Sequence, residues 1–89
     1  PGVTPSACKW LAEHDISFTG SDTLHYGKAD RIEEGFVPNL LNKAGIQIME
    51  NMYLDELARN CIYEFIFIAL PLQIRGGTAS PIRPVAVVR

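Results

Sequence analysis

The sequence contains few cysteines. Only Cys8 and Cys61 occur among its 89 residues, and neither belongs to a CxxC or CxxxH spacing. A disulfide scaffold needs more cysteines, and a structural zinc site needs closer ligand spacing. We therefore expect two reduced thiols in the core of a cytoplasmic protein.

An excess of charge of one sign is also missing. Eight lysines and arginines face ten aspartates and glutamates, which gives a net charge of −2. Binding to phosphate backbones or to anionic lipid depends on a basic surface. Nucleic acid and membrane surfaces are therefore disfavoured as partners.

Long hydrophobic runs are absent as well. The longest uncharged run, residues 65–74, contains Pro71 and is about half as long as a membrane-spanning helix. We expect no membrane span. The sequence has no basic and then apolar N-terminal segment and starts with Pro1, so we expect a fragment or a processed chain.

What is present is the composition of a globular protein. Apolar residues make up 47% of the sequence and charged residues 20%, which excludes disordered and collagen-like chains. A chain of this size buries roughly 65% of its extended surface, enough for one modest core. Residues 1–89 are thus expected to form a single domain or part of a larger one.

Apolar spacing predicts a helix followed by a strand, twice, in the first half of the chain. Thr4 can cap a first helix that has Pro5 at its first position, and a strand follows at residues 16–19. A second helix stops at Gly45, and another strand follows at residues 46–48. The expected apolar stripes of the two helices are Ala7, Trp10, Leu11 and His14, and Val37, Leu40, Leu41 and Ala44.

The second half predicts one more helix and two strands. A short helix is expected at residues 54–58, and the aromatic and β-branched run at residues 63–72 predicts a central strand covered on both faces. RGGTASP, residues 75–81, predicts a turn before a last strand at residues 84–88. The fold class is α/β, with three short helices and four strands. The aromatic residues expected in the core are Trp10, Tyr63, Phe65 and Phe67.

A polar segment at residues 20–35 predicts a long surface loop, and such loops often carry function. His25 in this loop is either simply exposed or a proton carrier or metal ligand. Asp22 and Thr23 are expected to stabilise the turn or to hold a neighbouring ligand in place. His14, at the end of the first helix, is expected to be structural.

Four segments in order resemble the C-terminal part of the cyclase family of metal-dependent hydrolases, which includes kynurenine formamidases and isatin hydrolases. They are PGVTPSACKWLAEHDI with GSDT, LLNKAGIQIMEN, LDELARNCIYEFIFIALPLQI and RGGTASPIRPVAV. The MEN segment followed by LDEL and the RGGTASPIRP turn are the most specific. The resemblance covers nearly the whole chain and implies the C-terminal portion of a larger β/β/α fold.

The resemblance also implies a site for one or two divalent metal ions, zinc or manganese. In that family an HxGTHxDxPxH cluster holds the metal, and this chain contains no such cluster. A histidine before an LL pair and the glutamate of the MEN motif complete the family's site. Glu50 matches the glutamate, whereas Val37, Pro38 and Asn39 stand where the histidine is expected. Asn39 or His25 is a possible replacement ligand.

From the residues alone, Glu50 is either a solvated acid at the end of a strand or a cation ligand, since an unpaired carboxylate in an apolar segment is costly. Gly76, Gly77, Thr78 and Ser80 either bind an anion or substrate carbonyl or simply connect two strands. No Ser-His-Asp, Cys-His, P-loop or dinucleotide motif is present in a usable form. Covalent catalysis and nucleotide binding are therefore disfavoured.

The leading hypothesis from the sequence is part of a metal-dependent, arylformamidase-like hydrolase. It would open an amide or other C–N bond of a small cyclic or aromatic substrate, and the 89 residues alone would be inactive. The first alternative is a catalytically inactive cyclase-like binding or structural module, and the second is an unrelated small α/β ligand-binding protein. A homo-oligomer is expected, because the apolar strands exceed what so small a domain covers.

Overall fold

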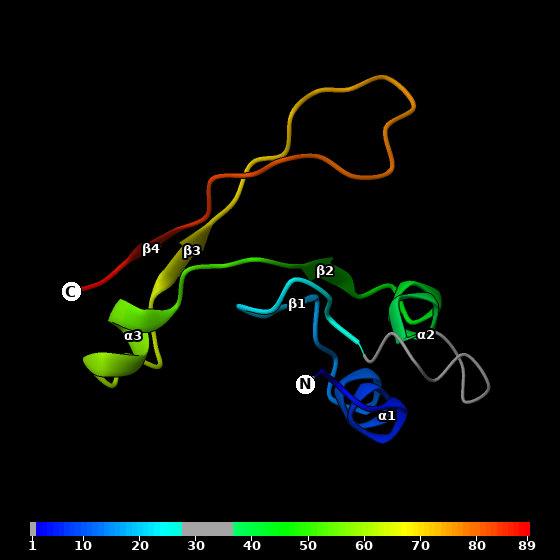
Figure 1. Ribbon diagram of the computed structural model, residues 1–89, viewed down its shortest axis with the longest axis horizontal. Helices are drawn as coiled ribbons and strands as arrows, with labels where there is room; N and C mark the ends of the chain where they lie inside the picture. Colours follow the sequence, from blue (N-terminus) through cyan, green and yellow to red (C-terminus); the bar gives the residue numbers. More distant parts are fainter. Residues whose placement is uncertain (1, 28–36) are drawn as a thin grey trace. The chain divides into compact units, whose positions relative to one another are not determined.

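The computed structural model describes residues 2–27 and 37–89 and contains both helices and strands (Figure 1). The α/β class expected from the sequence is confirmed in this part of the chain. None of its helices has the length and hydropathy that crossing a bilayer requires. In chain order the elements are α1 (Pro5–Glu13), β1 (Phe18–Gly20), α2 (Val37–Lys43), β2 (Gln47–Met49), α3 (Asp55–Arg59), β3 (Ile66–Ile68) and β4 (Val85–Val87).

The chain divides into two compact units, Pro1–Leu54 and Asp55–Arg89. The first unit contains a small core between α1, α2 and β2. Partly buried hydrophobic residues pack around this core, among them Leu11 and Ile48. Its buried members are Cys8, Tyr26, Val37, Leu41 and Ile46.

Helix α1 begins as the sequence predicts, and Leu11 of the predicted stripe packs against the core, but the rest of the buried stripe differs. The Thr4 hydroxyl accepts a hydrogen bond from the Ala7 N–H at 3.3 Å, and proline occupies the first turn. Cys8 and Leu11 face the core, whereas Trp10 is 56% exposed. The expectation that Trp10 and His14 belong to the buried stripe is therefore wrong. Their rings stack on each other at the helix surface instead, with centroids 3.9 Å apart.

Helix α2 ends at a glycine stop and leads directly into β2. Gly45 has a φ of +76°, a conformation that costs glycine little and other residues more. The Ile46 N–H donates to the Leu41 carbonyl at 2.9 Å, and the turn places the Ile46 side chain in the core. The predicted helix, stop and strand are thus confirmed.

Strands β1 and β2 form a two-stranded parallel sheet, in which Thr19 pairs with Ile48 and Gly20 with Met49. Parallel pairing brings the carboxyl ends of both strands to the same edge. Beyond that edge, the Met52 N–H donates to the Ser21 carbonyl at 3.0 Å, and the Asn51 N–H donates to the Thr23 carbonyl at 3.0 Å. The polypeptide after β1 is therefore held against the polypeptide after β2.

In the second unit, β3 and β4 form an antiparallel ribbon, in which Ile66 pairs with Val87 and Ile68 with Val85. This pairing confirms the strand-turn-strand ending. The prediction of a covered central strand at residues 63–72 is wrong for the described part of the chain, where only Ile66–Ile68 of this run is a strand and β4 is its one partner.

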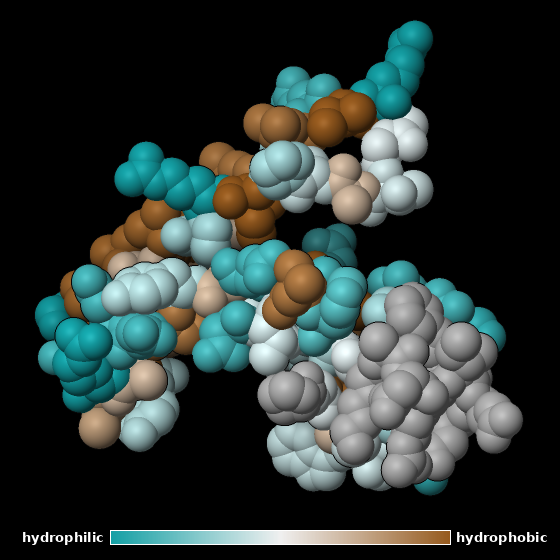
Figure 2. Space-filling model, viewed as in Figure 1, coloured by the Kyte–Doolittle hydropathy of each residue, from teal (hydrophilic) through white to brown (hydrophobic). Residues whose placement is uncertain are grey.

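Hydrophobic side chains remain exposed along this ribbon (Figure 2). Ile66 is 66% exposed and Tyr63 82%. The expectation that Tyr63 and Phe65 lie in a core is therefore wrong for the described structure. Cys61 is exposed too, so only Cys8 fulfils the expectation of a buried thiol. Other exposed members are Phe65, Ile68, Leu70, Leu72, Val85, Val87 and Val88.

Candidate functional site

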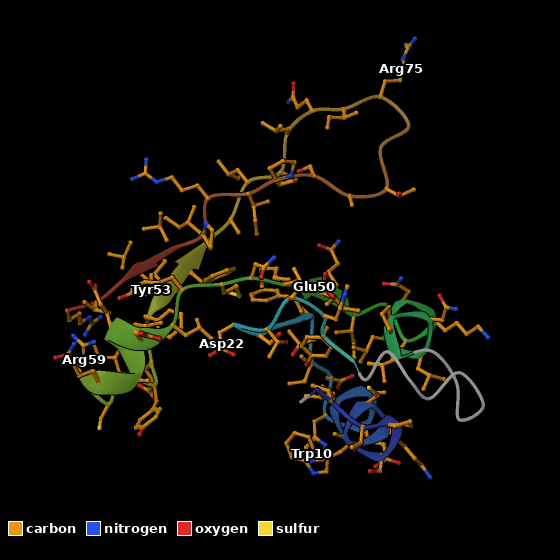
Figure 3. The ribbon with its side chains drawn as sticks, viewed as in Figure 1. Trp10, Asp22, Glu50, Tyr53, Arg59 and Arg75 are labelled. Carbon is orange, nitrogen blue, oxygen red and sulfur yellow. The ribbon has the colours of Figure 1, made fainter. Side chains whose placement is uncertain are left out.

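Glu50 follows the last residue of β2, at the carboxyl edge of the parallel sheet (Figure 3). This is the position in α/β sheets where functional side chains gather. The residue as a whole is exposed, but its carboxylate is engaged: Oε1 accepts a hydrogen bond from the Tyr26 N–H at 2.8 Å in a partly buried setting. The side chain is thus held in a defined direction and does not extend freely into solvent.

Tyr26 is itself firmly anchored. Its side chain is only 3% exposed and belongs to the core. Its hydroxyl forms a hydrogen bond with the Thr19 hydroxyl, and its carbonyl accepts from the Val3 N–H at 2.9 Å. Next to it, Gly27 forms a β-bridge with Val3. The expectation of a surface loop at residues 20–35 is therefore wrong at Tyr26, and residues 28–36 lie outside the described part.

The turn between Ser21 and Tyr26 is stabilised by side-chain hydroxyls. The Thr23 hydroxyl donates to the His25 carbonyl at 2.7 Å. Because a threonine hydroxyl has one hydrogen, the Ser21 hydroxyl is the donor in its 2.8 Å contact with Thr23. The turn role expected for Thr23 is confirmed. Asp22 lies exposed in the same turn (Figure 3).

The described residues do not by themselves form a metal-binding site. Residues 2–27 and 37–89 contain no group of three or more histidine, cysteine, aspartate or glutamate side chains that could hold a metal ion. A carboxylate with one oxygen held by an N–H can still bind a cation through the other oxygen. The role of Glu50 as a metal ligand therefore stays a prediction, and any further ligands would have to come from outside the described residues.

The two residues predicted to replace the missing histidine, His25 and Asn39, lie in different parts of the fold. His25 is exposed, and it directly precedes the residue whose N–H holds Glu50. Asn39 is exposed in α2. In the same helix Val37 is buried in the core and Pro38 is half-buried. The roles of His25 and Asn39 as ligands stay predictions.

Thr78 and Ser80 belong to the second unit, in the connection between β3 and β4. The Ser80 hydroxyl accepts from the Leu72 N–H at 3.0 Å and donates to the Pro81 carbonyl at 2.9 Å. These bonds join the two sides of the connection, so they give Ser80 a structural task. A substrate-binding role for Thr78 and Ser80 stays a prediction.

Sequence reasoning selected Glu50 but missed Tyr26 and Thr19. The available signal was a large aromatic residue in an otherwise polar segment, which usually marks a buried anchor. Nothing in the local sequence shows that the amide of this residue reaches a carboxylate 24 positions away.

Three curated relatives of this chain are named kynurenine formamidase. A kynurenine formamidase of Paracidovorax citrulli is 30% identical over 81 residues, which are 91% of this chain and 36% of the relative. One of Delftia acidovorans is 30% identical over 81 residues, 91% of this chain and 37% of the relative. One of Bordetella petrii is 28% identical over 83 residues, again 91% and 37%.

No protein-family model and no solved structure matches the chain. The chain spans little more than a third of the length of the curated relatives that it matches. Nearly all of this sequence is similar to proteins named kynurenine formamidase.

Proposed function

We propose that this chain is part of a cyclase-family hydrolase that cleaves an amide or other C–N bond of a small cyclic or aromatic substrate, in the manner of a formamidase. The observation that carries the proposal is the position of Glu50. This residue matches the family's ligand glutamate, lies at the carboxyl edge of a parallel sheet and is oriented by a backbone N–H. The similarity to kynurenine formamidases supports the same reaction class.

When bound, a zinc or manganese ion supplies polarisation of the substrate carbonyl and activation of water. The task of Glu50 is to present a carboxylate oxygen to that ion. Because the Tyr26 N–H holds Oε1, the side chain does not have to be ordered when the ion arrives. The remaining metal ligands and the general base lie outside the described residues in this proposal.

A second candidate, a catalytically inactive binding module, is favoured by a different observation. At the position of the family's histidine the chain has Val37, Pro38 and Asn39, and Val37 is only 5% exposed within the core. A valine cannot bind a metal. The two candidates differ in whether the native protein carries a metal that depends on Glu50.

The test is the metal content of the native protein, purified with everything that is translated together with these residues. We expect stoichiometric zinc or manganese in the wild type and its loss in Glu50→Gln. The matched control is Glu13→Gln, which removes another exposed carboxylate of the same unit. A metal-free wild type, or a Glu50→Gln variant that keeps its metal, would overturn the proposal and favour the module.

We also propose that the protein forms a homo-oligomer in which the β3–β4 ribbon is covered by a second copy. Ile66, Ile68, Val85 and Val87 alternate with residues of the opposite face, so they lie together on one face of the ribbon. All four are at least 43% exposed. Two copies of one apolar face are complementary in chemistry, and exposed apolar faces of this kind mark interaction surfaces.

A further inference from the structure

The outer edge of β2 carries backbone groups that point away from β1. The Gln47 N–H donates to the Ser17 carbonyl at 3.2 Å, and the Met49 carbonyl accepts from the Ser21 N–H at 3.1 Å. Gln47 and Met49 therefore face β1. Because the backbone groups of successive residues in a strand alternate between its two edges, the N–H and the carbonyl of Ile48 point to the opposite edge.

The same alternation continues past the end of the strand. The Asn51 N–H donates to the Thr23 carbonyl at 3.0 Å, which lies on the side of β1. The N–H of Glu50, one residue earlier, therefore faces the same way as the backbone groups of Ile48. In residues 2–27 and 37–89, β1 is the only strand that pairs with β2. The outer edge thus presents two N–H groups and a carbonyl to a further strand.

The sequence of β2 is typical of a strand with a neighbour on each side. Natural sheets protect their edge strands with lysine, proline or β-bulges. Residues 46–49 read Ile-Gln-Ile-Met and contain no proline and no charged side chain. By contrast, Arg83 and Pro84 directly precede β4 in the ribbon. Parallel strands are also rarely found outside larger sheets that are covered on both faces.

The length of the curated relatives indicates a source for the neighbouring strand. This chain spans 36–37% of their length, so nearly two thirds of each relative has no counterpart in these 89 residues. We propose that an extended segment of the native polypeptide outside these 89 residues pairs with the outer edge of β2 and forms the third strand of this sheet. Main-chain hydrogen bonds to Ile48 and Glu50 hold it there.

The surroundings of β2 determine the chemistry of the added strand. Ile48 packs against the core, so the side chain beside it on the added strand is apolar. Glu50 follows Ile48 by two residues, and in extended polypeptide both side chains project to the same face. The side chain beside Glu50 is therefore polar or basic, since opposite charges on neighbouring strands attract. The added strand thus brings a new side chain next to the candidate site.

This pairing is independent of the reaction in the proposed function, because the backbone of β2 points outward whatever Glu50 binds. Both proposals share only the expectation that these residues belong to a longer polypeptide. Backbone pairing can therefore be tested without measuring metal content or activity.

The first measurement is amide hydrogen exchange, followed by NMR, on the native protein with everything that is translated together with these residues. The Gln47 N–H is the internal control, since it is bonded to Ser17 with or without a third strand. We expect the amides of Ile48 and Glu50 to exchange at least about 100-fold more slowly than unprotected amides. Unprotected exchange at Ile48 would overturn the proposal: with Gln47 protected the edge is open, and with Gln47 unprotected the sheet itself is absent.

The second measurement identifies the partner strand by nuclear Overhauser contacts in the same protein. We expect contacts from the Ile48 N–H to backbone protons of a residue outside residues 1–89. Contacts to a third segment within these 89 residues, or contacts between two copies in a mixture of differently labelled protein, would overturn the proposal. None of these results changes the metal content of the wild type or its dependence on Glu50, by which the proposed function stands or falls.

Discussion

Replacing Glu50 by alanine should destabilise the first unit even without any metal. The carboxylate accepts the N–H of Tyr26, a residue that is 3% exposed. Hydrogen bonds to charged groups contribute about 1.5–3 kcal/mol, and a buried N–H left without an acceptor costs about 1–3 kcal/mol. Because this bond is only partly buried, we expect Glu50→Ala to lower the free energy of unfolding by about 1.5–2 kcal/mol.

The matched variant Glu50→Gln separates this structural role from metal binding. The glutamine carbonyl can still accept the Tyr26 N–H, so only the contribution of the charge is lost, about 0.5–1 kcal/mol. Glutamine is nevertheless a poor substitute for a carboxylate ligand. Glu50→Gln should therefore lose metal while keeping most of the stability.

The assay is urea unfolding in the presence of a chelator, followed by the fluorescence of Trp10. This residue is the only tryptophan of the chain and lies in the same unit as Glu50. The free energy of unfolding should decrease in the order wild type, Glu50→Gln, Glu50→Ala. If the alanine variant is as stable as the wild type, the Tyr26–Glu50 bond contributes nothing and the argument for a directed carboxylate fails.

Four further predictions concern the thiols and the ribbon. Cys61 has a φ of +52°, a left-handed backbone conformation that is strained for cysteine and unstrained for glycine. Cys61→Gly should therefore raise the free energy of unfolding, measured by urea titration, by about 1 kcal/mol. An unchanged free energy of unfolding would count against strain at this residue. Exposed Cys61 should react rapidly with a thiol reagent and buried Cys8 only upon unfolding. Desolvation by burial raises the pKa of the Cys8 thiol above its ordinary 9.0. Unfolding free energy should therefore fall as pH rises from 9.0 through the folded pKa, and this slope should be weaker in Cys8→Ala. The wild-type chain should self-associate in sedimentation experiments, and the Ile66→Lys variant should be monomeric, because Ile66 is 66% exposed on the ribbon. If Ile66→Lys leaves the association unchanged, this face of the ribbon is not the interface between copies.

The elements predicted best are those whose first and last residues are determined by a few neighbouring residues. Thr4 and Pro5 start α1, and Gly45 ends the turn after α2 with a positive φ. Capping hydrogen bonds and left-handed backbone act within one turn, so the local sequence is sufficient to place them.

The elements predicted poorly depended on what covers them. An apolar run such as residues 63–72 indicates a strand, but its composition does not distinguish two covered faces from an exposed ribbon. In α1 the spacing through Trp10 and the spacing through Cys8 and Leu11 both fit a helix. Packing against α2 selected the second.

The candidate site likewise depends partly on local sequence and partly on tertiary packing. The sequence by itself determined that a carboxylate, Glu50, follows a β-strand, and the resemblance gave this carboxylate a role. Only the tertiary structure decided that it is directed by the amide of Tyr26 and that Thr19 holds the tyrosine. The physical reason is that the two strands pair in parallel and bring distant segments to one edge of the sheet, a long-range event that no local pattern encodes.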